Sequence, residues 1–243
     1  MSGHSKWHNI QGRKGKQDAV RSNQFTKSAK MITIAAQKGA DPEMNFSLRL
    51  AIDKAKAVGM PKDNIDRAIK RGTGELSDGV QMEELLYEGF GPGGTALIIK
   101  IVTDNKNRAS SETKHILSKH GGNLGTTGSV QWMFELRGLI IVPLKQLEAN
   151  KINEDEFELS IIDAGADDIV ADGELLEIKT KPEQFQKVLT VLKNLAIEPL
   201  ESGIRFLPKE TMTVNEEVKA RLEALFSELE EHDDVEDYYT NAI

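Results

Sequence analysis

Length, composition and charge exclude several classes of protein. The chain has 243 residues and no cysteine, so disulfide frameworks, thiolate nucleophiles and cysteine-ligated zinc sites are excluded, and a reducing compartment is favoured. It contains no run of about 18 apolar residues, and its first residues lack the apolar region of a secretory signal. We therefore expect a cytoplasmic protein that makes no contact with a membrane.

Charge is distributed unevenly along the chain. The formal net charge is −8, but residues 1–76 carry 15 Lys and Arg against 7 Asp and Glu, whereas residues 77–243 carry 16 against 32. A basic segment on an acidic body is typical of a protein in which one part meets nucleic-acid phosphates. The alternative is that the basic segment docks on the acidic remainder of its own chain.

Residues 1–21 are predicted to form a basic, flexible arm. Before Val20 their large apolar residues are Trp7 and Ile10, which bury too little surface for independent folding. Long cationic side chains on such an arm follow a phosphate backbone and release counterions. Trp7 either stacks on an unpaired base or anchors the arm to the helices that follow. The candidate nucleic-acid contacts of the arm are Lys6, Trp7, Arg13, Lys14, Lys16 and Arg21.

Three short helices are predicted over residues 22–76, where they form a bundle. Ser22 is expected to cap the first helix, and Gly39, Gly59 and Gly72 are expected to end the three helices in turn. Apolar residues recur at helical spacing in each of them. The cationic side chains that point away from the apolar stripes, and that we assign to nucleic-acid binding, are Lys27, Lys30, Arg67, Lys70 and Arg71.

From residue 80 the apolar periodicity becomes that of strands alternating with helices. We expect an α/β domain made of residues 80–136 and 208–243, with a second domain inserted over residues 138–207. The inserted segment has the order βαββαβ, which is the split βαβ or ferredoxin-like arrangement with helices on one face of an antiparallel sheet. The strands expected in the outer domain are 83–89, 95–103, 129–136, 211–214 and 234–240. The predicted fold class is therefore α+β and multidomain, with an N-terminal three-helix bundle and two α/β domains, one inserted in the other.

Two further segments are relevant to the binding of small anions, and the first of them is a candidate site. Asn107 and Arg108 precede or open a helix predicted near 107–120, and a helix N-terminus with a nearby Arg holds an anion. We treat them as a possible secondary anion contact, although capping of the helix by Asn107 or Ser110 explains the same residues. The glycine-rich stretch 121–128 matches neither the phosphate loop nor the dinucleotide fingerprint, so it is interpreted as a helix stop and a flexible connection.

Catalytic and metal-binding patterns find little support in the sequence. His4 and His8 share a helical spacing, but no carboxylate or cysteine lies near them, so a solvated pair is favoured over a metal site. None of the common hydrolase, metalloprotease or kinase motifs is present. The carboxylates of residues 228–237 have the pattern of a solvated surface. We expect no catalytic residues, no metal and no cofactor.

A set of motifs along the chain resembles the YebC/PmpR family. The motifs are GHSKW at 3–7, FTK at 25–27, NIDRAIKRG at 64–72, YEGFGPGG at 87–94, TDN at 103–105 with Asn107 and Arg108, and GSV at 128–130. The resemblance covers nearly the whole chain and implies an N-terminal helical domain and two α/β domains in a cytoplasmic, DNA-binding transcriptional regulator. Relatives also include a mitochondrial translational activator of cytochrome c oxidase subunit I and bacterial proteins linked to translation. Ala109 departs from the Thr expected at that position, so no hydroxyl contact is expected there.

The leading hypothesis is a non-enzymatic regulator of gene expression that binds nucleic acid through its basic N-terminal part. The resemblance favours DNA, whereas contacts with phosphates serve ribosomal RNA equally well, so a ribosome-associated translation factor is the alternative. A third possibility is a protein-interaction adaptor that uses the acidic α/β domains.

Overall fold

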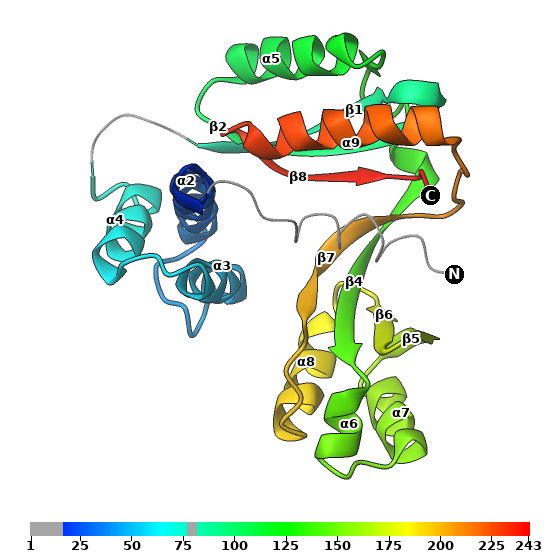
Figure 1. Ribbon diagram of the computed structural model, residues 1–243. Helices are drawn as coiled ribbons and strands as arrows, with labels where there is room; N and C mark the ends of the chain where they lie inside the picture. Colours follow the sequence, from blue (N-terminus) through cyan, green and yellow to red (C-terminus); the bar gives the residue numbers. More distant parts are fainter. Residues whose placement is uncertain (1–16, 77–81) are drawn as a thin grey trace. The chain divides into compact units, whose positions relative to one another are not determined.

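The computed structural model describes residues 17–76 and 82–243, with side chains from residue 24 onward (Figure 1). These residues form two compact units. The inserted unit is Trp132–Thr211, and the outer unit comprises the described residues up to Gln131 together with Met212–Ala242. Each unit combines helices with one antiparallel sheet. The predicted α+β fold class is therefore confirmed.

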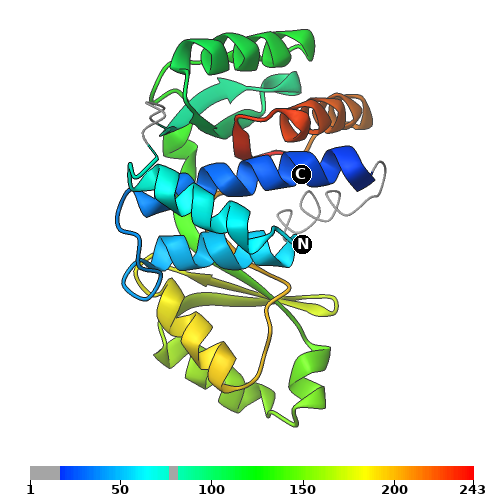
Figure 2. The same cartoon turned by 90° about the vertical axis from the view of Figure 1, so that its left-hand side faces the viewer.

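The outer unit begins with three helices that lie side by side, coloured blue to cyan in Figure 2. They are α2 (Gln17–Ala36), α3 (Phe46–Ala57) and α4 (Lys62–Gly72). Asn45 caps α3 by accepting a hydrogen bond from Leu48 N through its side chain. Helix α2 begins five residues before Ser22, the expected cap, so part of the predicted arm is helical. No Gly or Pro separates Gly15 from Gly39, and nothing in this stretch therefore stops the helix from extending toward its N-terminus.

Apolar side chains from all three helices form the core of this bundle. Its buried members include Ile32, Leu48, Ile52, Ala55, Ile65 and Ala68. Helices α2 and α4 approach closely at Gly72, where an added Cβ would lie 2.7 Å from the Cβ of Ala36. Nearby, Thr33 Oγ1 donates to Ala68 O at 3.2 Å. The predicted apolar periodicity therefore corresponds to a real three-helix core.

The first sheet has the strand order β3-β1-β2-β8 and belongs to the outer unit. Strand β1 (Glu83–Phe90) and strand β2 (Ala96–Thr103) form a hairpin around a short 3-10 turn at Pro92–Gly94. Strand β8 (Val235–Thr240) pairs antiparallel with β2, and the two-residue strand β3 (Asn123–Leu124) pairs with β1. Helices α5 (Lys106–Lys119) and α9 (Glu216–Glu231) lie against the sheet (Figure 1).

A buried carboxylate anchors the loop that leads out of this sheet. Glu88 is 5% exposed, and its carboxylate accepts hydrogen bonds from the backbone N–H groups of Gly128, Val130 and Gln131 at 2.6 to 2.8 Å. Burial opposes ionisation of Glu88, but these three donors hold its pKa below the ordinary value. The glycine-rich connection after α5 is thus tied to β1 at both β3 and Glu88, and the expectation of a flexible connection was wrong.

The inserted unit has the order βαββαβ in sequence and β5-β6-β4-β7 in its sheet. All three strand pairings are antiparallel, which is the ferredoxin-like arrangement that the periodicity predicted. Its helices lie beneath the sheet in Figure 2. The elements are β4 (Phe134–Pro143), α6 (Lys145–Ala149), α7 (Glu154–Asp163), β5 (Ala166–Asp172), β6 (Leu175–Thr180), α8 (Phe185–Asn194) and β7 (Glu201–Pro208).

Two strands differ from the sequence-based expectation. The strands predicted at 129–136 and 139–143 are one continuous strand, β4, which begins at Phe134 after a 3-10 turn at Gln131–Met133. Strand β4 pairs with β7 from Phe134 onward, so all of it belongs to the second sheet. The strand expected at 211–214 is reduced to an isolated bridge between Met212 and Ala242. Strand periodicity shows that a segment is extended but does not identify its partner in a sheet.

We predict that Gly138→Ala destabilises the inserted unit by about 1–3 kcal/mol, because overpacking of a filled site costs that much. A Cβ at Gly138 would lie 2.6 Å from Phe185 Cδ2 and closer still to Thr180 Oγ1. The matched control is Gly203→Ala, one register position away in the same strand pair. There the nearest heavy atom is 3.8 Å from the new Cβ, so stability should hardly change. Urea unfolding measures both, and equal losses would contradict the packing argument.

Candidate nucleic-acid interface

Helix α4 presents a group of exposed cations. Arg67, Lys70 and Arg71 are three and four residues apart, a spacing that places them on the same side of a helix. All three are exposed, and the apolar Ile65 and Ala68 of the same helix are buried. Within the described part of the chain, Arg67 and Lys70 form no ion pair. The exposed Asp63 and Asp66 of the same helix reduce its net positive charge.

Lys27 and Lys30 of α2 have a different environment, because both contact the α9–β8 turn, by which we mean residues 230–235 from the end of α9 to the start of β8. Lys27 Nζ donates to Glu230 O at 2.6 Å. Lys30 Nζ donates to Asp233 O at 2.9 Å and to Asp234 Oδ1 at 2.6 Å. Burial lowers the pKa of Lys27 below its ordinary value, against the opposing influence of Glu230 and Asp233. Both lysines were predicted to bind nucleic acid, but in this structure their ammonium groups donate hydrogen bonds to the protein itself.

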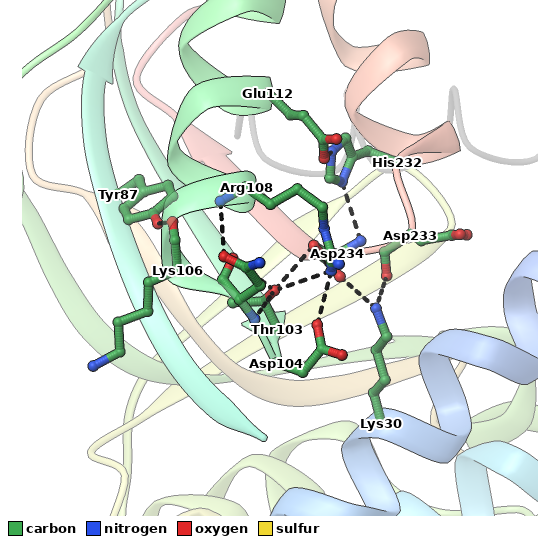
Figure 3. Close-up of polar contacts among 11 residues, drawn as sticks. Lys30, Tyr87, Thr103, Asp104, Lys106, Arg108, Glu112, His232, Asp233 and Asp234 are labelled. Carbon is green, nitrogen blue, oxygen red and sulfur yellow. Dashed lines mark hydrogen bonds and ion pairs between the residues drawn. The ribbon is translucent and has the colours of Figure 1, made fainter. Parts of the chain in front are cut away.

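The centre of this contact is Asp234, which collects hydrogen bonds from three elements (Figure 3). Its side chain is 3% exposed. Besides Lys30, it accepts a hydrogen bond from Thr103 Oγ1 at 3.0 Å and one from Arg108 Nη2 at 2.9 Å. Burial opposes ionisation, but the hydrogen bonds from Lys30 and Arg108 outweigh it and hold the pKa of Asp234 below its ordinary value. Asp234 is thus an ionised carboxylate buried among cationic donors.

The first turn of α5 supplies Arg108 to this cluster. The cap of α5 is Asn105, whose Oδ1 accepts a hydrogen bond from Arg108 N at 3.0 Å, so the expected capping by Asn107 or Ser110 was wrong. Asn107 is exposed. Arg108 Nη2 contacts Asp104 Oδ1 and Asp234 Oδ2, each at 2.9 Å, and the side chain remains 44% exposed. Ala109 is fully buried.

A possible metal-ligand group borders the cluster. Single ligand atoms of Glu112, His232 and Asp234 lie within 4.8 Å of one another. However, His232 Nε2 is 2.9 Å from Glu112 Oε2, and His232 Nδ1 accepts a hydrogen bond from Asp234 N. Both oxygens of Asp234 already accept from cationic side chains. The ligand atoms are therefore engaged in hydrogen bonds, and the residues do not fit a cation.

The remaining predicted contacts lie outside the described residues. These are Lys6, Trp7, Arg13, Lys14, Lys16 and the side chain of Arg21. The residues that sequence reasoning missed are Thr103 and Asp234, which join α2 to the first sheet. Asp234 lies in a run of carboxylates that all have the same local pattern, so no local feature distinguished it from its exposed neighbours. Among the described residues, no helix combines the length and apolar character needed to cross a membrane.

Comparison with known proteins gives consistent results over the whole chain. Residues 5–75 match a family model described as the TACO1/YebC protein N-terminal domain, and residues 82–242 match one described as the TACO1/YebC second and third domain. A probable transcriptional regulatory protein from Halothermothrix orenii is 48% identical over 243 residues, covering 99% of this chain and 94% of that protein. One of the same description from Maridesulfovibrio salexigens is 47% identical over 242 residues, covering 100% and 95%.

A solved structure is also similar. The crystal structure of a conserved hypothetical protein from Aquifex aeolicus has a TM-score of 0.84 and 40% sequence identity, and the match covers 98% of this chain and 96% of that one.

We predict that the contribution of Asp234 to stability depends on pH. Because its folded pKa is lowered, the ionised form stabilises the fold above the ordinary Asp pKa, and this stabilisation is lost as the pH falls through the lowered value. Asp234→Asn should therefore cost about 1–3 kcal/mol at pH 7, and the difference from the unsubstituted chain should shrink from about pH 5 downward. Urea unfolding across this range measures it. A difference that stays constant with pH would show that the carboxylate charge is not responsible.

Proposed function

Because this chain belongs to the TACO1/YebC family, we propose that it is a non-enzymatic, nucleic-acid-binding regulator of gene expression that acts in the cytoplasm. The observation that carries the proposal is the group of exposed cations on α4, Arg67, Lys70 and Arg71. Side chains of this kind neutralise phosphates and release counterions. The proposal extends to the basic N-terminal arm, whose residues Lys6, Trp7, Arg13, Lys14, Lys16 and Arg21 follow from the sequence alone.

The names of the relatives favour DNA as the target, since those proteins are called probable transcriptional regulatory proteins. We propose DNA as the first target on that ground. The chemistry of α4 is less selective, because Lys and Arg contacts to phosphates position a protein on any nucleic acid without reading its sequence. Ribosomal RNA is therefore the second target, and the protein would then act in translation.

Asn107 and Arg108 remain a secondary anion contact in this proposal. Asn107 is exposed at the start of α5. The hydrogen bonds of Arg108 to Asp104 and Asp234 use Nη2, so an approaching phosphate would meet the Nε and Nη1 side of a guanidinium that is partly exposed. Because Arg108 is already compensated by two carboxylates, we assign it less weight than Arg67 or Lys70.

We expect the triple substitution Arg67→Glu, Lys70→Glu and Arg71→Glu to weaken binding of a labelled, mixed-sequence DNA duplex. If each cation neutralises one phosphate, the slope of log K against log salt should become shallower by about 3. The matched control is Lys181→Glu, Lys187→Glu and Lys193→Glu, which changes the net charge equally at three exposed lysines of the inserted unit. Fluorescence anisotropy between about 50 and 200 mM salt measures both slopes. Equal effects of the two triples would place the contact elsewhere.

Sedimentation distinguishes the two targets. As a DNA-binding regulator, the protein should stay out of ribosomal fractions when a cell extract is run on a sucrose gradient, and promoter DNA should be enriched in a pulldown. Comigration with ribosomal particles that is lost after ribonuclease treatment would assign the protein to translation instead. A stoichiometric protein partner that persists after nuclease treatment would support the adaptor alternative.

A further inference from the structure

The α9–β8 turn places several oxygen acceptors within hydrogen-bond distance of Lys27 and Lys30. The two lysines are three positions apart on α2, so their side chains leave the same side of the helix. The ammonium group of Lys27 meets the backbone carbonyl of Glu230. That of Lys30 meets the backbone carbonyl of Asp233 and the carboxylate of Asp234 (Figure 3). A nucleic-acid phosphate also presents oxygen acceptors to a lysine, and these resemble the charged carboxylate of Asp234 more than the two carbonyls.

The turn restricts the access of a phosphate to these lysines, most strongly at Lys30. Lys30 has three N–H donors and gives two of them to Asp233 and Asp234, and its side chain is only 14% exposed. The turn also carries the acidic side chains of Glu230, Asp233 and Asp234, which repel a phosphate backbone. Nucleic acid and the turn therefore compete for the same two ammonium groups.

The turn has anchors to the first sheet and to α5 that do not involve α2. Asp234 O accepts a hydrogen bond from Val102 N at 2.8 Å. The Asp234 carboxylate keeps Thr103 and Arg108 as donors, so releasing Lys30 does not strand a buried, unpaired charge. On the α2 side, burial disfavours the charged form of Lys27, and this penalty ends once the side chain reaches water. After separation the Asp234 charge thus stays compensated by Arg108 at Oδ2, although Oδ1 loses its donor Lys30.

We propose that the α9–β8 turn, residues 230–235, is an internal competitor for nucleic acid, which occupies Lys27 and Lys30 until phosphates displace it. The proposal rests on the nucleic-acid-binding function proposed above and adds its regulation. The acidic turn then has a role beyond that of a solvated surface, because the negative charge of the turn determines how easily nucleic acid displaces it from Lys27 and Lys30. Loss of the competitor should strengthen binding.

A double-mutant cycle tests the competition directly. We expect Asp234→Asn to tighten binding of the labelled DNA duplex by about 5-fold or more, in the range of typical coupling between sites. The slope of log K against log salt should change little, because Lys27 and Lys30 contact phosphates in the complexes of both chains. In a background with Lys27→Met and Lys30→Met, Asp234→Asn should have no such effect. Glu223→Gln removes the same charge from an exposed position of α9 and should leave affinity nearly unchanged.

Several outcomes overturn the proposal. An equal gain in the Lys27→Met, Lys30→Met background, or an equal gain from Glu223→Gln, would mean that loss of negative charge anywhere strengthens binding. Binding by the unsubstituted chain without a gain in Asp234→Asn would overturn the competitor alone. Absence of binding by every variant, to the DNA duplex and to an RNA hairpin of equal length, would overturn the proposed function as well.

A second measurement avoids any variant that folds poorly. Circular dichroism and thermal unfolding first establish whether Asp234→Asn keeps its structure. Independently, hydrogen exchange of the unsubstituted chain is followed with and without a saturating amount of the DNA duplex. We expect the amides of residues 232–235 to exchange faster in the complex, because α2 no longer covers the turn. Unchanged or slower exchange there, with binding confirmed by anisotropy, would overturn the competitor mechanism.

Discussion

Burial of the Asp234 carboxylate constrains much of the outer unit. An ionised carboxylate removed from water must be compensated by well-placed donors, because an unpaired buried charge costs several kcal/mol. Asp234 meets this requirement with Lys30 from α2, Arg108 from α5 and Thr103 from β2. The position of α2, the first turn of α5 and the start of β8 therefore depend on one anion. Glu88 plays a comparable part for the loop that ends at Gln131.

The basic segment holds its cations in two different environments. Lys27 and Lys30 dock on the acidic turn of their own chain, whereas Arg67, Lys70 and Arg71 remain exposed on α4. Internal docking thus applies to part of the basic segment, and under the proposed function the exposed cations of α4 meet a polyanion before Lys27 and Lys30 are released. The basic segment therefore pairs two lysines of α2 with the acidic part of the chain, while the cations of α4 stay exposed.

Local patterns predicted most elements but not all of their ends and partners. The βαββαβ order of the inserted unit followed from periodicity, since a core-facing helix and a half-buried strand each impose their own spacing on apolar residues. Helix α2 was expected to begin at Ser22, because a capping residue was given more weight than the absence of a helix breaker before it. Strand β4 was divided in two because its pairing with β7 joins segments about 70 residues apart in the sequence, and no local pattern records such a partner.

The order of the residues by itself determined the fold class, the helical bundle, the basic and acidic parts and the family, because all of these depend on local spacing and composition. It did not determine burial. Glu231, Asp233 and Asp234 look alike in the sequence, yet the first two are exposed and Asp234 is buried. That difference arises because α2, β2 and α5 converge on one side chain from positions more than 100 residues away. Whether a carboxylate is buried and ionised depends on the solvent and the donors around it, and only the folded chain brings those donors together.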